Sequence, residues 1–496
     1  MPSAAGESLE SRRRDGARRW APSLPVLIWL GMVALPLTAA LKLLNDPDTY
    51  WHIEAGRWML SHHAVPFFDP FSHSLPGAPW FAHEWLAELI FALVYQYSGW
   101  NGTILVAVFS FAAALALLTR FLLPHFKPIH ALLAVALGAG LTMPHLLVRP
   151  HVLAFPILVL WVAALVRARD NDASPPWRAL PLMVLWVNLH GGFLFGLALA
   201  GFFMVEAVLS APDFAARRRE AGRWTLFVLL AGLVSALNPR GFEALLFPFH
   251  VLGQAVLQAE IIEWKSVDFQ QFQVLEVCLL GLLALGFSTG VRLPLTRTAL
   301  LLLLVHMALK HQRHGDLLGL CAPLVVAAPL GAQLRLLLPK MTAAEHRASR
   351  PASAGAVALA GLLTLGLAAG FSARPIERVD GPNTPHSALL AAQALGLSGP
   401  VFNAHPFGGY LIFNGVAPFI DGRLDMYGDA FWSRHLRAYT GDRQALLSIL
   451  HDYRIRWTML ESGSPAVGVL DHLPGWQRVY TDGFAVIHRY SSPGSD

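Results

Sequence analysis

Apolar and polar residues follow one another in long blocks along most of this chain. Between residues 22 and 373, apolar stretches alternate with short polar segments, and a helix needs about 20 apolar residues to cross a membrane. The first stretch is too long for a signal-peptide core and lacks a convincing cleavage site, so we expect it to be retained as a helix. The pattern predicts a polytopic α-helical membrane protein with about eleven transmembrane helices. Their ranges are 22–44, 103–123, 129–147, 151–168, 178–190, 192–210, 224–238, 273–290, 298–310, 316–335 and 355–373.

Basic residues give this helical array an orientation. An Arg-rich segment, 1–21, precedes the first predicted helix, and cytoplasmic loops of membrane proteins are enriched in Lys and Arg. With this segment in the cytoplasm, every loop that returns to the cytoplasmic side contains Arg or Lys. We therefore expect residues 22–373 to form a membrane module and residues 374–496 to lie outside the cytoplasm.

The segment 45–101 is predicted to be a long external loop. It contains two amphipathic stretches, 49–61 and 84–97, which we expect to lie as helices along the outer face of the membrane. Loops of this length are usually functional or disordered, and the aromatic content of this one argues against disorder. Asp69 precedes a proline and is expected to form a turn that folding needs.

Composition supports an integral membrane protein. The 496 residues are 55% hydrophobic and 14% charged, whereas soluble domains carry about 25% charged residues. The formal net charge of +5 comes from loops between apolar runs, which membrane topology explains, so we expect no nucleic-acid partner. Cys278 and Cys321 lie inside apolar segments and imply neither a disulfide framework nor a zinc site.

The tail, 374–496, is less hydrophobic and is predicted to be a small α/β domain. A helix is expected at 443–453, with a further helix-like stretch between the last two strands. The predicted strands are 400–403, 409–413, 417–421, 456–460 and 484–488. Asp421 and Arg423 flank a glycine after the third of these strands. This turn either reaches over the membrane site or pairs the two charges to stabilise the fold.

Two acids directly follow the first predicted helix. Asp46 and Asp48 flank Pro47. Carboxylates at a membrane boundary bind a divalent cation such as Mg²⁺ or Mn²⁺, or accept a proton from an attacking hydroxyl. The alternative is a solvated helix end with an Asx turn.

Further polar clusters fall on the same external side. Two are basic, Arg149 with His151, and Lys310 with Arg313 and His314. Arg donates paired hydrogen bonds to phosphate, so both clusters are candidates to hold a lipid phosphate, with headgroup anchoring as the alternative. The other candidates are His52, His83, Glu84, Asn188, His190 and Glu263, of which Asn188 and His190 alternatively form a break between two helices. We expect the acids after the first helix, His83 or Glu84, and Arg149 to line one cavity.

These motifs resemble a known family. An acidic motif after the first helix, a long external loop with two surface helices and many further spans resemble the GT-C superfamily of glycosyltransferases. It includes protein O-mannosyltransferases, aminoarabinose transferases of lipid A and the catalytic subunit of oligosaccharyltransferase. The chain is most similar to a bacterial branch without an assigned reaction. The shared motifs are Asp-x-Asp-x-x-Trp-His-Ile at 46–53, Asp-x-Phe-Ser at 69–72, His-Glu-Trp-Leu at 83–86, Gly-Gly-Tyr-Leu at 408–411 and Asp-Gly-Arg at 421–423.

The resemblance implies a sugar transfer from a polyprenyl-phosphate donor to a lipid or glycan acceptor at the outer face of the bacterial inner membrane. Asp46 or Asp48 would be the base or a metal ligand, and the segment 83–84 takes the place of the mannosyltransferase His-Pro-Pro motif. The chain lacks that Pro-Pro and the Trp-Trp-Asp signature of oligosaccharyltransferase, so a peptide acceptor is not expected. A transporter or flippase of a lipid-linked or anionic substrate, and a non-catalytic scaffold, are the alternatives.

Overall fold

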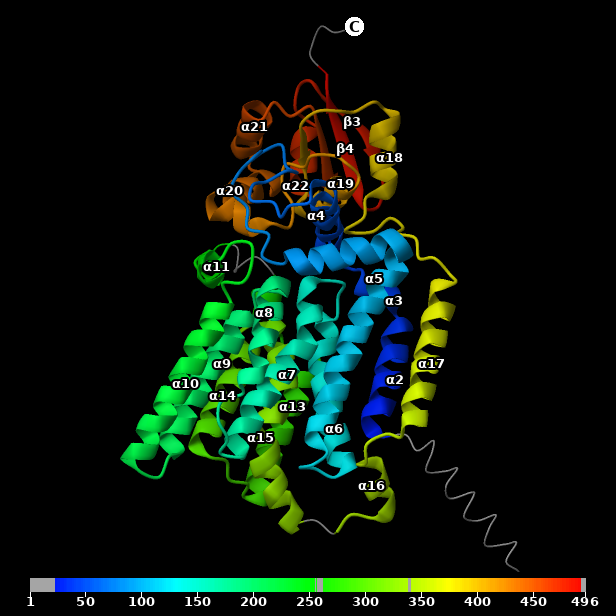
Figure 1. The fold of residues 1–496 in the computed structure, drawn as a ribbon. Coiled ribbons are helices and arrows are strands. Elements are labelled where there is room, and N and C mark those ends of the chain that lie inside the picture. The colour runs from blue at the N-terminus through cyan, green and yellow to red at the C-terminus, as the bar shows by residue number, and fades with distance from the viewer. Residues whose placement is uncertain (1–22, 255, 257–261, 338–339, 492–496) are drawn as a thin grey trace, which may run out of the picture.

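A helical bundle and a small mixed domain at one end of it make up the structure (Figure 1). The structure is a computed structural model that describes residues 23–254, 256, 262–337 and 340–491. The basic segment predicted to be cytoplasmic, 1–21, lies outside the described residues.

Each of the predicted transmembrane ranges contains a helix. The helices of the bundle and its loops are α2 (Leu24–Leu37), α3 (Ala40–Leu43), α4 (Asp48–His62), α5 (Trp85–Leu122), α6 (Pro128–Thr142), α7 (Pro150–Asp170), α8 (Leu180–Leu189), α9 (Phe193–Ser210), α10 (Phe214–Val234), α11 (Glu243–Leu252), α13 (Val274–Thr289), α14 (Leu295–Lys310), α15 (Gly315–Leu337), α16 (Ala343–Ala348) and α17 (Ala354–Ser372). Short 3₁₀ turns occur at Met143–His145, Trp177–Ala179, Ile262–Trp264 and Gln312–His314.

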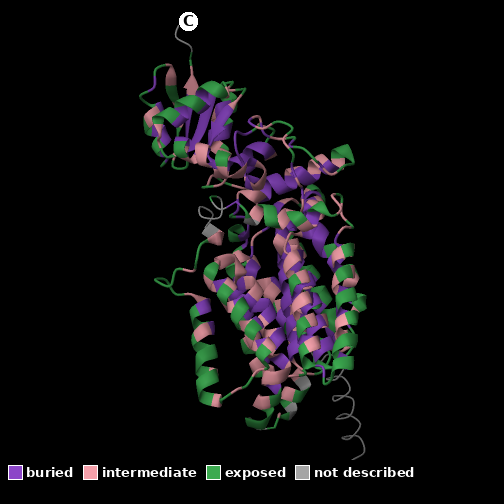
Figure 2. Cartoon of the chain, turned by 90° about the vertical axis from the view of Figure 1, so that its left-hand side faces the viewer, coloured by how far each residue is buried: buried purple, intermediate pink, exposed green. Residues whose placement is uncertain are grey.

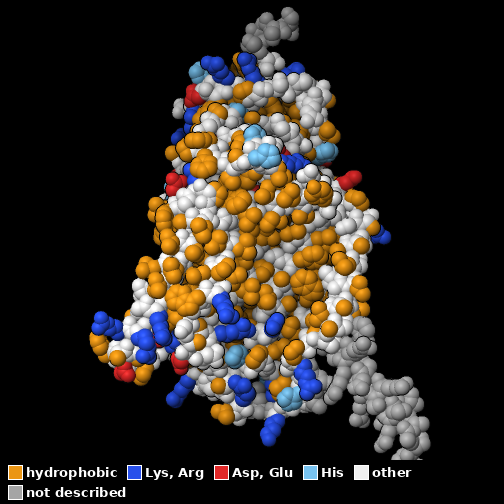
Figure 3. Space-filling model, viewed as in Figure 1, with side chains coloured by type: hydrophobic (Ala, Val, Ile, Leu, Met, Phe, Trp, Pro, Cys, Tyr) orange, Lys and Arg blue, Asp and Glu red, His pale blue; other side chains and the backbone are white. Residues whose placement is uncertain are grey.

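Fewer helices than the eleven expected are both long enough and apolar enough to cross a membrane, among the residues that the structure describes. Within the described ranges, six helices are long and apolar enough to cross a membrane, and Leu24–Leu37, Trp177–Leu189 and Val274–Thr289 are shorter apolar helices. The count of about eleven spans therefore stays a prediction. Figure 3 shows a broad band of apolar side chains, with Lys and Arg side chains below it at the end opposite the small domain. This distribution fits a multi-pass membrane protein.

Burial separates central from peripheral helices (Figure 2). In the most apolar 18-residue windows of α5 and α7, 67% of the residues are buried, against 11% in α17. The apolar side chains of α17 therefore point away from protein, as expected for a helix that faces lipid.

Two helices begin or bend differently from the sequence pattern. The sequence predicts a loop through Arg217 and Arg219, but α10 already begins at Phe214, because the Asp213 side chain caps it by accepting a hydrogen bond from the Ala216 amide. α5 joins the predicted surface stretch to the next span in one helix with a kink at Gly99, whose φ of 55° suits glycine. In Figure 1 the first part of α5 crosses the end of the bundle and the second part runs down into it.

The small domain has a four-stranded sheet covered by short helices. The strands are β1 (Val401–Asn403), β2 (Trp457–Glu461), β3 (Trp476–Thr481) and β4 (Ala485–Tyr490), in the order β1-β2-β4-β3. β1 and β2 are parallel, and β4 pairs antiparallel with β2 and β3. The helices are α18 (His386–Ala394), α19 (Gly408–Phe413), α20 (Leu424–Tyr439), α21 (Arg443–Asp452) and α22 (Pro465–Leu470).

Two of the predicted strands are wrong. The range 409–413 belongs to helix α19, whose apolar residues are buried, and a short buried run does not distinguish a strand from a helix by its period. The range 417–421 is not a strand, because a side chain replaces a neighbouring strand as its partner. The Asn403 amide accepts from the Phe419 N–H at 2.7 Å and donates to the Ile420 carbonyl at 2.8 Å. Strand β3, which lies at the sheet edge, was missed.

Candidate functional site

A cavity of about 420 Å³ lies where the loops at one end of the bundle meet the small domain. Its polar wall includes Asp48, His52, Glu84, Arg149 and Arg313. Its apolar wall comes from α7, α9 and α11, through residues such as Ala154, Phe155, Leu158, Leu194, Phe195 and Phe247. Ligand pockets are typically about 300–1,000 Å³. The volume thus suffices for a substrate headgroup and part of an apolar chain.

Arg149 is the centre of the charged wall. Its guanidinium nitrogens lie 3.3 Å from Asp46 Oδ2, 3.1 Å from Asp48 Oδ2 and 2.9 Å from Glu263 Oε1. Pro150 begins α7 directly after Arg149 and places this side chain at the helix N-terminus. The predicted meeting of the first acids with Arg149 is therefore present, and Glu263 joins them.

The loop before α4 orients the two acids. Asp46 Oδ1 accepts a hydrogen bond from the Asp48 amide at 2.7 Å, so the Asx turn of the alternative is present, but Asp46 is buried rather than solvated. Asp48 is the first residue of α4, and its Oδ1 accepts from the Trp51 indole at 3.0 Å. Gly422 of the small domain packs so closely here that a Cβ on it would lie 1.7 Å from Asp48 Oδ1. The Asp48 side chain is thus held from both sides.

Burial and Arg149 act in opposite directions on these acids. Burial raises the pKa of Asp46 to about 7, although Arg149 opposes the rise. The pKa of Asp48 is also raised by burial. Arg149 lowers the pKa of Glu263 to about 2, so Glu263 keeps its negative charge at any physiological pH. An acid that titrates near pH 7 is suited to accept a proton from a substrate.

The guanidinium of Arg149 lies beside the two acids that were predicted to bind a divalent cation. It lies within 3.3 Å of Asp46 and 3.1 Å of Asp48, where it supplies the positive charge that Mg²⁺ or Mn²⁺ would bring. Metal binding by this pair stays a prediction. A group with metal-ligand spacing occurs elsewhere in the site, at His52, Glu84 and Glu88.

Glu84 lies among three histidines. Its carboxylate oxygens are 3.8 Å from His52 Nε2, 3.7 Å from His83 Nε2 and 3.5 Å from His190 Nε2. Burial raises the pKa of Glu84 to about 7. The segments that carry these residues are far apart in the sequence, so this cluster depends on the packing of α4, α5 and the turn after α8.

The basic cluster of 310–314 divides between cavity and surface. Arg313 and His314 line the cavity, and the Arg313 guanidinium stacks on the Trp264 ring at 4.8 Å. Arg313 forms no ion pair with any residue that the structure describes. Lys310 is exposed and does not line the cavity. Of the predicted second phosphate clamp, Arg313 is the side chain in place to bind an anion.

The remaining candidates contribute to structure. Asn188 accepts a hydrogen bond from the Trp85 indole at 2.7 Å and donates to the Leu237 carbonyl at 2.9 Å, so it links three segments. His151 lines the cavity, and its Nε2 lies 2.9 Å from the His145 carbonyl. These contacts leave Asn188 with a structural role, as its helix-break alternative implied.

Asp421 and Arg423 form the fold-stabilising pair. Arg423 donates from Nε and Nη2 to the two Asp421 oxygens at 2.8 and 2.7 Å, and from Nη1 to Asp69 at 2.6 Å. The side chains of all three residues are fully buried. Neither charge lines the cavity, whereas Gly422 between them does. The turn therefore supplies backbone to the site, and its charges tie the external loop to the small domain.

Sequence reasoning missed several residues of the site. Glu88 is buried beside His52, and its position four residues after Glu84 placed it on the same helix face. Asp316 and Asp425 also line the cavity. Asp316 lies two residues after His314, and Asp425 lies two residues after Arg423, so each follows a residue that the sequence did single out.

Comparisons with known proteins give structural matches. No protein-family model matches the chain, and no curated protein matches it significantly. The apo form of the Archaeoglobus fulgidus oligosaccharyltransferase matches with a TM-score of 0.49 and 10% identity over 87% of this chain and 69% of that chain. ArnT from Cupriavidus metallidurans bound to undecaprenyl phosphate matches with a TM-score of 0.49 and 14% identity over 94% of this chain and 98% of that chain. These structural neighbours are GT-C membrane glycosyltransferases. Because these sequence identities are so low, the matches concern the fold, and any reaction has to be inferred from the side chains of this chain.

Proposed function

We propose that this protein is a membrane glycosyltransferase that moves a sugar from a polyprenyl-phosphate-linked donor to a lipid or glycan acceptor. The make-up of the cavity wall carries the proposal. Charged side chains of the loops and apolar side chains of α7 and α9 share one cavity. A lipid-linked phosphate sugar has the matching chemistry, because its phosphate is anionic and its chain is apolar.

Arg313 is the first contact that we propose for the donor phosphate. It reaches the cavity, lies over the Trp264 ring and has no ion-pair partner among the described residues. Arg149 already pairs with three carboxylates, so it adds positive potential while staying tied to the acids. Such fixed charges stabilise the negative charge that develops on a leaving phosphate.

Asp48 is the base in this proposal. Asp48 lines the cavity, whereas Asp46 lies behind it and is not part of the lining. The acceptor oxygen attacks the anomeric carbon, the bond from that carbon to the phosphate oxygen breaks, and the phosphate keeps the electron pair. The acceptor's hydroxyl proton passes to Asp48. This direct displacement inverts the anomeric centre, and general-base catalysis contributes about 10²–10⁴-fold.

A reconstituted transfer assay tests the proposal. Purified protein in liposomes that contain bacterial envelope lipids as acceptors is supplied with a labelled polyprenyl-phosphate sugar, and release of polyprenyl phosphate is measured. Asp48→Asn preserves shape and removes the base, so the rate is expected to fall by about 10²-fold or more. Asp452→Asn, on the surface of the small domain, is the matched control. A transporter would move the donor intact without releasing polyprenyl phosphate. Full activity in both Asp48→Asn and Asp46→Asn would contradict the proposed catalytic role of these two acids.

The orientation belongs to the same proposal, with the small domain outside the bacterial inner membrane. Alkaline phosphatase is active only outside the cytoplasm. A phosphatase fused after Gly370, near the end of α17, is expected to be active, and one fused after Arg219 in α10 is expected to be inactive. The reverse result at either position would contradict this topology.

A further inference from the structure

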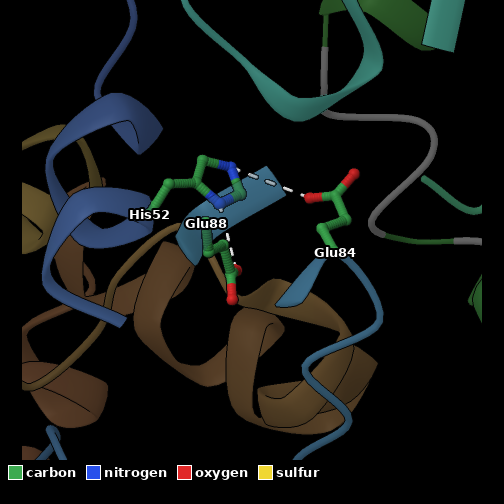
Figure 4. Close-up of side chains that lie close together, drawn as sticks. All are labelled: His52, Glu84 and Glu88. Carbon is green, nitrogen blue, oxygen red and sulfur yellow. Dashed lines mark hydrogen bonds and ion pairs between the residues drawn. The ribbon is translucent and has the colours of Figure 1, made fainter. Parts of the chain in front are cut away.

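His52 lies between two carboxylates at the edge of the cavity (Figure 4). Its Nδ1 is 3.2 Å from Glu88 Oε1, and its Nε2 is 3.8 Å from Glu84 Oε2. Each of the three side chains offers one ligand atom within 4.8 Å of the other two. His52 and Glu88 are each 1% exposed, and Glu84 is 9% exposed. This is a buried, preformed cluster of nitrogen and oxygen donors.

The carboxylates of this cluster lie beyond ion-pair distance from the Lys and Arg side chains that the structure describes. Among the described residues, the ion-pair partners of Glu84 and Glu88 are histidines and no Lys or Arg. Glu88 Oε2 is buried and has no hydrogen-bond partner. Burying carboxylates in this state is costly unless a cation or protons compensate them.

Hydrogen bonding determines which nitrogen of His52 is free. Burial raises the pKa of Glu88, and a bound cation favours its ionised form. That form can only accept, so it takes the proton on Nδ1 and leaves a lone pair on Nε2. That lone pair faces Glu84 at 3.8 Å, which is too long for a hydrogen bond. His83 repeats the pattern, since its Nδ1 lies 3.3 Å from the Phe81 carbonyl and its Nε2 faces Glu84. Two imidazole lone pairs thus face Glu84. His190 differs, because its Nδ1 accepts from the Gly192 amide and its Nε2–H points toward Glu84 at 3.5 Å.

We propose that His52, Glu84 and Glu88 form a site for one divalent transition-metal ion of the zinc type. The ion lies between His52 Nε2 and Glu84, and Glu88 holds the imidazole from its other nitrogen. Zinc-ligand distances of about 2.0–2.2 Å at a tetrahedral angle separate two ligand atoms by about 3.4 Å. The 3.8 Å gap needs only a small contraction to meet that value. A carboxylate on the second nitrogen is the usual support of a metal-bound histidine.

The donor set distinguishes this site from the one predicted at Asp46 and Asp48. An imidazole nitrogen favours Zn²⁺ and similar ions, whereas Mg²⁺ prefers oxygen ligands. Burial holds the pKa of His52 well below its usual value, so the imidazole is neutral and able to bind an ion. His83 Nε2, 3.7 Å from Glu84, is a further nitrogen near the ion. The ion would add a fixed positive charge to the cavity wall.

Metal binding to the full-length protein tests this proposal. The protein is purified in detergent without a polyhistidine tag, treated with a chelator and titrated separately with Co²⁺, Zn²⁺ and Mn²⁺. We expect one Co²⁺ per chain, displaced by Zn²⁺, and Mn²⁺ electron spin echoes with the coupling of a bound imidazole nitrogen. Glu88→Gln is expected to weaken binding by about 10–100-fold. His52→Ala and Glu84→Gln are expected to abolish stoichiometric binding.

Two controls make the outcome decisive. Glu54→Gln changes an acid on the same helix that pairs with Arg57, and it should leave binding unchanged. Asp48→Asn should also retain the ion. No stoichiometric binding by the wild-type protein, an echo without nitrogen coupling, or loss of the ion in Asp48→Asn would overturn the site. The metal titration and the electron spin echoes of the wild-type protein test the site even if a variant fails to fold. The assay contains no sugar donor, so its result is independent of the proposed transfer reaction.

Discussion

Loss of the Arg423 charge is expected to destabilise the joint between the external loop and the small domain. Arg423 pairs with Asp421 and Asp69 through hydrogen bonds of 2.6–2.8 Å, and none of the three side chains is exposed. The guanidinium also lies 5.0 Å from the ring of Phe71 and 4.8 Å from that of Trp80. One side chain thus holds a loop residue, a turn residue and two aromatic rings in place.

The charge balance of this cluster gives the magnitude. Arg423→Gln leaves two buried carboxylates without a cation, and breaking a buried pair in this way costs about 3–5 kcal/mol of unfolding free energy. Asp69→Asn has a smaller effect, because Arg423 and Asp421 still balance each other. Asp69 accepts from the Phe71 and Ser72 amides as well as from Arg423, so an amide NH₂ there faces a donor, at a cost of about 1–3 kcal/mol.

An exposed Arg–Asp pair in the same domain provides the matched control. Arg434 and Asp452 form an ion pair with side chains 36% and 47% exposed. Exposed pairs contribute about 0–1 kcal/mol, so Arg434→Gln should change stability little. Urea unfolding of the full-length proteins in detergent, followed by tryptophan fluorescence, measures all variants, since Trp432 and Trp457 are buried in the small domain.

The expected order of stability loss is Arg423→Gln, then Asp69→Asn, then Arg434→Gln. Equal unfolding midpoints for Arg423→Gln and Arg434→Gln would refute the reasoning, because they would mean that the buried charges are not balanced by Arg423. Loss of transfer activity in Arg423→Gln at unchanged stability would also contradict it and would assign Arg423 to the substrate.

Three further predictions concern the cavity. Asp48→Asn should lower the transfer rate by about 10²-fold with an unchanged unfolding midpoint, and a matching loss of stability would show that Asp48 acts in folding instead. Arg313→Gln should raise the KM for the donor, whereas Lys310→Gln, three residues away but outside the cavity, should not; equal effects would count against the phosphate contact. Burial raises the pKa of Asp46, which shares Arg149 with Asp48, to about 7. A carboxylate is protonated below its pKa, so kcat/KM should fall as the pH drops through about 7, and a flat profile from pH 5 to 8 would show that Asp46 does not titrate in the reaction.

The sequence by itself determined the helical character of this protein and the end of the bundle at which its polar clusters meet. Runs of apolar residues predict helices because each backbone group in a membrane has to bond within its own helix. Such runs are local, so every predicted segment of 22–373 contains a helix in the structure. The polar clusters between runs were visible for the same reason, and Asp48, Glu84 and Arg149 do line one cavity.

Tertiary structure decided which of these side chains meet and what each of them does. Arg149 binds Glu263, 114 positions later, and no local pattern encodes such a partner. Arg313 enters the cavity while Lys310 does not, because the direction of a side chain depends on the turn between α14 and α15 and on the helices packed around it. The range 409–413 is a helix, and the sequence did not distinguish it from a strand because Gly409–Ile412 are buried and a short buried run has no diagnostic period. Burial itself is a property of the packed chain, and it is burial that brings the pKa of Asp46 to about 7.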